Sequence, residues 1–166
     1  MEYFKELNTT PRILLGPGPS MVHPRVLRAM AHPLVGHLDP QFVNLMNEVQ
    51  EMLRYVFETT NKLTLPISGT GSAGMDAVCC NFVEPGDPVL VCTNGYFGER
   101  LFEMVSRYGA DVTRLDRPWG SIFSPADIKT ALEEKPAKIV TMVMAETSTG
   151  TLQPLEEIAK IVHSHG

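Results

Sequence analysis

The turn Ser68-Gly69-Thr70-Gly71-Ser72 has residue types and a spacing that suit phosphate binding. The apolar, partly β-branched residues 63–67 before it predict a buried strand, and the apolar spacing of residues 72–83 after it predicts a helix. A turn between a strand and a helix leaves backbone N–H groups unpaired at the positive end of the helix dipole. Gly69 and Gly71 let the backbone approach an anion closely, and the hydroxyls of the turn can donate hydrogen bonds. The sequence therefore predicts a bound phosphate group.

Two nucleotide ligands fit this turn poorly. A mononucleotide P-loop is excluded, because no Gly-Lys-Ser or Gly-Lys-Thr follows the turn. Residues 69–74 do match the G-x-G-x-x-G pattern of dinucleotide-binding domains. In those domains an acidic residue at the end of the next strand binds the ribose, whereas here that strand ends in Cys92-Thr93-Asn94. The dinucleotide alternative is therefore weakened.

A small phosphorylated ring, such as pyridoxal phosphate, is the third alternative. Besides the phosphate, such a ligand needs an aromatic plane to stack on and a hydroxyl near its phenolic oxygen. Tyr96 or Phe97 could supply the plane, and Thr147 or Ser148 could supply the hydroxyl. Each of these candidates follows a predicted strand. This alternative therefore gives a role to each of the three loops with unusual residues after a predicted strand: one binds the phosphate, one stacks on the ring and one binds the phenolic oxygen.

The order of the predicted elements indicates an α/β fold. Apolar strands that alternate with helices form a mostly parallel sheet with helices on both faces, and ligands bind at the carboxyl edge of such a sheet. The expected strands are residues 63–67, 88–92, 111–115 and 138–144. The expected helices are residues 24–30, 40–57, 72–83, 97–108, 125–134 and 155–164.

Composition excludes several classes of function. The net charge of −5 gives no basic face for nucleic acid, and no apolar run is long enough for a membrane span. The three cysteines and five histidines show no metal-ligand spacing, so we expect no metal site. We expect the cysteines to be buried free thiols, which suits a reducing compartment such as the cytoplasm.

Five motifs occur in an order that resembles the N-terminal part of class-V pyridoxal-phosphate aminotransferases. The nearest resemblance is to the alanine/serine–glyoxylate (serine–pyruvate) group, and it extends from about Pro11 to Gly166. The motifs are residues 14–20 (LLGPGPS), 68–72 (SGTGS), 84–87 (EPGD), 94–100 (NGYFGER) and 146–150 (ETSTG). The resemblance implies the large domain of a fold-type I enzyme, with residues 1–22 as an irregular segment and residues 23–166 as the N-terminal part of that domain.

The resemblance also implies roles for single residues. Ser68 belongs to the phosphate-binding turn, where the backbone amides of Gly69, Thr70 and Gly71 would hold the cofactor phosphate. Phe97 would stack on the pyridine ring, and Thr147 would hydrogen-bond its phenolic oxygen. Residues near the substrate cleft would be Gly18, Gly36 and His37, and members of the family are homodimers.

The implied reaction is transfer of an amino group from alanine or serine to glyoxylate or pyruvate. Ureidoglycine as the donor and a non-catalytic module that binds a phosphorylated ligand are the alternatives. A transaminase needs a lysine for the Schiff base and a carboxylate at the pyridinium nitrogen. No lysine follows a predicted strand here, so we expect both groups and the C-terminal small domain beyond Gly166, and the 166-residue chain to be inactive alone.

Overall fold

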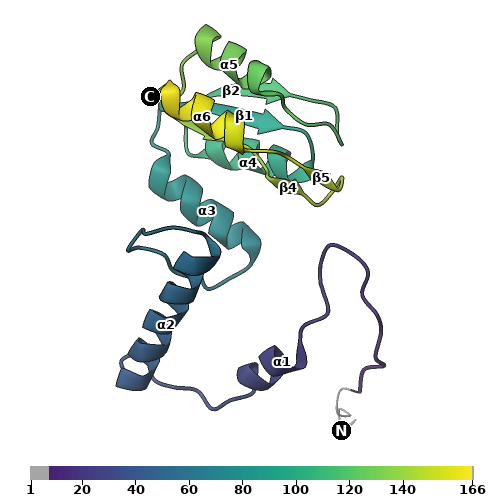
Figure 1. Cartoon of the computed structure of the whole chain (residues 1–166), viewed down its shortest axis with the longest axis vertical. Coiled ribbons are helices and arrows are strands. Elements are labelled where there is room, and N and C mark those ends of the chain that lie inside the picture. Colours follow the sequence, from purple (N-terminus) through teal and green to yellow (C-terminus); the bar gives the residue numbers. More distant parts are fainter. Residues whose placement is uncertain (1–7, 166) are drawn as a thin grey trace, which may run out of the picture. The chain divides into compact units, whose positions relative to one another are not determined.

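The computed structural model describes residues 8–165 of the chain. Two compact units make up the chain, Met1–Leu65 and Pro66–Gly166 (Figure 1). No helix in the described part is both long and apolar enough to cross a bilayer.

The first unit contains two helices, α1 (Pro24–Met30) and α2 (Pro40–Val56), after a stretch, residues 8–22, without helix or strand. Both helices begin with proline, whose fixed φ suits the first helical position. Each has a side-chain cap, because His23 accepts from the Arg25 N–H and Asp39 accepts from the Gln41 N–H. These helices confirm the two that we predicted for this part of the chain.

The second unit is built on a parallel sheet of three strands in the order β2-β1-β3. The central strand β1 (Pro88–Thr93) pairs in parallel with β2 (Asp111–Asp116) on one side and with β3 (Ile139–Thr141) on the other. The other elements are α3 (Gly71–Phe82), α4 (Tyr96–Arg107), α5 (Pro125–Glu134), α6 (Glu156–Ser164) and a small antiparallel pair, β4 (Ala145–Glu146) with β5 (Thr151–Leu152).

Helices cover both faces of this sheet. Successive side chains of a strand point to opposite faces, so β1 divides its apolar residues between two cores. On one face Leu90 and Cys92 pack against residues of α5 and α6, and on the other Val89 and Val91 pack against residues of α3 and α4. Because β1 is buried on both sides, its sequence is a continuous apolar run, as is typical of parallel sheets. The predicted fold class is thus confirmed.

The strand predicted for residues 63–67 is wrong. This segment is extended but has no strand partner in the part of the chain that the structure describes. Pro66 also lacks an N–H group for a strand ladder. Leu63 is 84% exposed, so the segment has neither the pairing nor the burial of an inner strand.

The strand predicted for residues 138–144 is too long. Pairing with β1 ends at Thr141, and the chain then forms the β4–β5 hairpin, which the sequence did not predict. Gly150 has a φ of 77° and its N–H donates to the Glu146 carbonyl, which closes the turn of the hairpin. The apolar residues after Thr141 therefore connect β3 to the hairpin and do not extend the strand.

The cysteines were predicted only partly. Cys79 and Cys92 are buried and free, as expected, whereas Cys80 is exposed. Burial raises the pKa of the Cys92 thiol to about 12 and also raises the pKa of Cys79. Cys80 faces solvent because α3 buries only one side, on which Cys79 lies.

Candidate active site

The N-terminus of α3 presents free backbone donors. Thr70 is the N-cap residue, and its side chain makes no capping hydrogen bond. Its carbonyl accepts from the N–H groups of Ala73 and Gly74. Among the described residues, we find no acceptor for the N–H groups of Gly71 and Ser72. These donors lie at the positive end of a twelve-residue helix, so the site suits an anion.

The other helices of the second unit have N-termini that are occupied or acidic. At α4, Glu146 accepts from the N–H groups of Phe97 and Gly98. A capping box of Ser124 and Asp127 closes the start of α5. The first turn of α6 carries two glutamates, which disfavour an anion. Within the described part of this unit, α3 therefore offers the one open helix N-terminus without an acidic residue in its first turn.

Gly69 fits the tight entry into α3 because it has no side chain. Its φ of +153° lies in a region that L side chains rarely adopt. A Cβ at this position would also lie 2.9 Å from the Cβ of Ala73. The turn therefore keeps its backbone uncovered, which is what close approach of a phosphate requires.

Phe97 and Thr147 line one pocket in the second unit. The pocket has a volume of about 450 Å³, within the range of small-ligand sites. Its walls come from α3, α4 and the segment from β3 to Thr147. Two of the three predicted strand-end regions, those that carry Phe97 and Thr147, therefore share one hollow. The lining residues are Met75, Val78, Phe97, Leu101, Met142, Val143, Met144, Ala145 and Thr147. The turn of residues 68–71 is not part of the lining but leads directly into α3, which is.

The geometry favours Phe97 and Thr147 over their neighbours as ring contacts. The Tyr96 ring is exposed and meets the Phe97 ring edge to face, with 5.4 Å between the ring centroids. The Ser148 hydroxyl accepts from the Tyr96 N–H and donates to Glu146. The Ser148 hydroxyl is therefore already hydrogen-bonded within the protein, while Phe97 and Thr147 face the pocket.

No lysine lines this pocket in the described part of the chain. Lys138 lies at the start of β3, where its ammonium group is 2.6 Å from a carboxylate oxygen of Asp87. This hydrogen bond lowers the pKa of Asp87, and it raises the pKa of Lys138. The pair lies at the amino ends of β1 and β3, away from their carboxyl ends.

The remaining predicted site residues lie in the first unit. Gly18, Gly36 and His37 are all exposed there, and their role near the substrate remains a prediction. Sequence reasoning missed the role of Glu146, which is 1% exposed and fully engaged in hydrogen bonds. The signal in the sequence was an acidic residue just after a predicted strand, at the sheet edge where the predicted helices begin and a carboxylate can cap a helix.

A profile of the family described as aminotransferase class-V matches residues 13–166 of this chain. Among curated proteins, the chain is 47% identical to (S)-ureidoglycine–glyoxylate transaminase of Bacillus subtilis, over 94% of this chain and 38% of that protein. It is 40% identical to alanine–glyoxylate aminotransferase of Drosophila melanogaster, over 86% of this chain and 36% of that protein.

The chain is also similar to solved structures of aminotransferases. The chain matches alanine–glyoxylate aminotransferase from Nostoc sp. with a TM-score of 0.96 and 51% identity, over 99% of this chain and 44% of the other. The match to ureidoglycine–glyoxylate aminotransferase from Bacillus subtilis has a TM-score of 0.94 and 45% identity, over 97% and 42%. The chain spans about two-fifths of the length of these relatives. The profile match, which covers nearly all of the chain, shows that it belongs to the class-V aminotransferase family.

Proposed function

We propose that this protein is a pyridoxal-phosphate-dependent aminotransferase that moves an amino group from a small amino acid, alanine or serine, to glyoxylate or pyruvate. Membership of the class-V family supports the activity, and relatives named alanine–glyoxylate aminotransferase support the substrates. The observation that carries the proposal is the open N-terminus of α3, which leads into the wall of a pocket containing an aromatic ring and a hydroxyl.

The residues present fit the two ends of this cofactor. The turn from Ser68 to Gly71 and the first turn of α3 would hold the phosphate through backbone amides and hydroxyls. Phe97 would stack on the pyridine ring, and Thr147 would donate to the phenolic oxygen. Because Gly69 leaves the backbone uncovered, the phosphate can approach the amides without a clash.

When bound, pyridoxal phosphate serves as the electron sink that makes amino-group transfer possible. This chain's own residues would bind the cofactor and set its orientation. The amides at α3 would fix the phosphate end, and the hydroxyl of Thr147 would hold a hydrogen bond at the ring oxygen. Apolar side chains that line the pocket, such as Leu101 and Met142, would exclude water around the ring. A lysine that would carry the cofactor is not among the described residues that line this pocket.

A ureidoglycine donor is the second candidate. The observation in its favour is the 47% identity to the Bacillus subtilis (S)-ureidoglycine–glyoxylate transaminase. Assaying the active protein with alanine, serine and ureidoglycine, each with glyoxylate as the acceptor, decides between the two. Faster turnover with ureidoglycine than with alanine or serine would replace our first choice of donor.

We also propose that the intact enzyme is a cytoplasmic homodimer. The exposed apolar side chains of α2, such as Leu45 and Met52, suit a surface that a second subunit covers. The free buried thiols Cys79 and Cys92 suit a reducing compartment. Light scattering of the purified protein and fractionation of cells test these two points separately.

Titration of the protein with pyridoxal phosphate tests the cofactor site. We expect Gly69→Ala to weaken binding about tenfold or more, because it strains the backbone and crowds Ala73 at the entry to α3. Gly86→Ala is the matched control. Gly86 also has a positive φ of 87° but lies in the turn before β1, with open space around a Cβ. Equal affinity in Gly69→Ala and Gly86→Ala would contradict the proposed phosphate site.

A further inference from the structure

Glu146 is a buried carboxylate that is held by hydrogen-bond donors rather than by a cation. Its side chain accepts from the N–H groups of Phe97 (3.0 Å) and Gly98 (3.3 Å). It also accepts from the N–H group of Ser148 (3.2 Å) and from the Ser148 hydroxyl. Within the part of the chain that the structure describes, no lysine, arginine or histidine lies within salt-bridge distance of it. Its negative charge instead faces the positive end of α4.

The two oxygens of this carboxylate serve different segments. Oε2 accepts from the first turn of α4, which carries Phe97, and Oε1 accepts from the turn after β4. Thr147 lies between Glu146 and Ser148 in the chain. Because the Glu146 carboxylate accepts from Ser148, its hydrogen bonds fix both chain neighbours of Thr147. Glu146 itself does not line the pocket, whereas Phe97 and Thr147 do. One carboxylate thus joins the two segments that bring the aromatic ring and the hydroxyl to the pocket.

Gly95, the residue before α4, shows independently that the Glu146 side chain fills the space beside the start of this helix. A Cβ on Gly95 would lie 2.3 Å from Cγ and 2.5 Å from Cδ of Glu146. The φ of Gly95 is 177°, an extended value that any residue can adopt. Glycine is therefore needed here for the sake of the Glu146 side chain and not for the backbone conformation.

We propose that Glu146 is a positioning residue, which fixes the Phe97 ring relative to the Thr147 hydroxyl and thereby sets the affinity for the ring of the cofactor. The inference rests on the proposed function, since the ring belongs to pyridoxal phosphate. The phosphate end depends on α3, which makes no hydrogen bond with Glu146 in the described structure. Loss of Glu146 should therefore weaken the contacts of the ring and spare those of the phosphate.

The test compares two probes, pyridoxal phosphate and inorganic phosphate, in three variants of the protein. Glu146→Ala removes both hydrogen-bonding oxygens, and we expect it to weaken pyridoxal phosphate binding about tenfold or more, as loss of hydrogen bonds to a charged group does. Glu146→Gln keeps one acceptor oxygen, and we expect a loss of about threefold. Inorganic phosphate should bind both variants within about twofold of the unmodified protein. Glu133→Gln, an exposed glutamate of α5, is the matched control and should change neither affinity.

The ratio of the two affinities separates positioning from a purely structural role. General loosening of the fold would weaken both probes together, and that result, or an unchanged pyridoxal phosphate affinity in Glu146→Ala, would overturn the inference. If Glu146→Ala does not fold, the ratio in Glu146→Gln decides, and an unchanged ratio there overturns the inference as well. If the unmodified protein binds no pyridoxal phosphate, the proposed function fails, which is a different and recognisable outcome.

Discussion

Substitution of Gly95 by alanine is the change whose effect on stability follows most directly from the structure. The new Cβ would lie 2.3 Å from Cγ of Glu146, whereas carbon atoms in contact are normally about 3.5 Å or more apart. The backbone cannot relieve this overlap cheaply, because Gly95 is buried between β1 and α4. Glu146 must therefore move, and it then loses its hydrogen bonds to the N–H groups of Phe97 and Gly98.

The magnitude follows from these contacts. A hydrogen bond to a charged group contributes about 1.5–3 kcal/mol, and the longer bond to Gly98 contributes at the low end of that range. Alanine restricts the unfolded chain more than glycine does, which offsets about 0.4–1 kcal/mol. We expect Gly95→Ala to lower the free energy of unfolding by about 2–4 kcal/mol.

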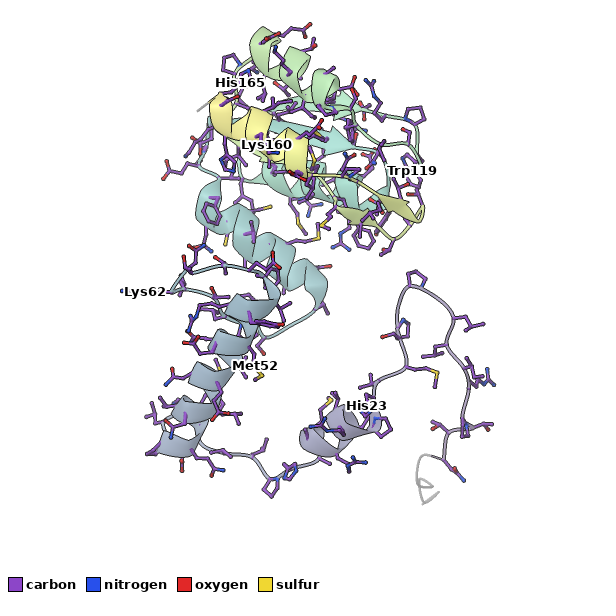
Figure 2. All side chains as sticks on the ribbon, in the orientation of Figure 1. His23, Met52, Lys62, Trp119, Lys160 and His165 are labelled. Atoms are coloured by element: carbon purple, nitrogen blue, oxygen red, sulfur yellow. The ribbon has the colours of Figure 1, made fainter. Side chains whose placement is uncertain are left out.

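The assay is urea unfolding followed by the fluorescence of Trp119. This residue is the single tryptophan of the chain and lies in the second unit, in the loop between β2 and α5 (Figure 2). Its signal therefore reports the unit that contains Gly95 and Glu146. Gly74→Ala is the matched control. A Cβ there meets nothing within 4 Å and α3 favours alanine, so we expect unfolding to cost up to about 1 kcal/mol more than in the unmodified protein.

A double-mutant cycle makes this prediction specific. In a Glu146→Ala background the space beside Gly95 is empty, so the added Cβ should cost less than about 0.5 kcal/mol. The expected coupling energy between the two positions is about 2 kcal/mol. If Gly95→Ala is equally destabilising with and without Glu146, the overlap is not the cause and the reasoning is refuted.

Two further predictions concern the thiols and the response to acid. Alkylation of the native protein near pH 8 should modify Cys80 alone, because Cys79 and Cys92 are buried with raised pKa values, and mass spectrometry showing rapid labelling of Cys92 would contradict this burial. The pKa of Asp87 is lowered from 3.8, chiefly by its hydrogen bond with Lys138, so its contribution to stability is present above the pKa of the unfolded state and is lost as pH falls through the folded value. Unfolding curves between pH 2 and pH 6 should thus show a flatter loss of stability in Asp87→Asn than in the unmodified protein.

Much of the fold could be predicted from the sequence because its elements carry local signals. Proline at the start of α1, α2 and α5 and the apolar run of β1 have physical causes that act within a few residues. The two errors came where local signals do not decide. Residues 63–67 have strand composition but no partner strand in the described structure, and residues 142–144 are apolar but lead into a hairpin. Strand pairing depends on residues far away in the sequence, which composition does not report.

In the candidate site, too, local sequence signals could be read, whereas contacts between distant residues could not. Ser68–Ser72 could be proposed as a phosphate site from the sequence, because a glycine-rich turn before a helix suits an anion. Residue types alone left Tyr96 and Phe97 open, since adjacent helical residues point in different directions. The family resemblance selected Phe97, and Phe97 lines the pocket. Glu146 was missed as a positioning residue because its donors lie 48 and 49 residues away in the chain.

A crystal structure of the protein grown with pyridoxal phosphate tests the central claim most directly. Our account predicts the phosphate within hydrogen-bond distance of the amides of Gly69, Thr70 and Gly71, with the ring against Phe97 and its phenolic oxygen at Thr147. A phosphate bound elsewhere, with the N-terminus of α3 in contact only with water, would contradict it.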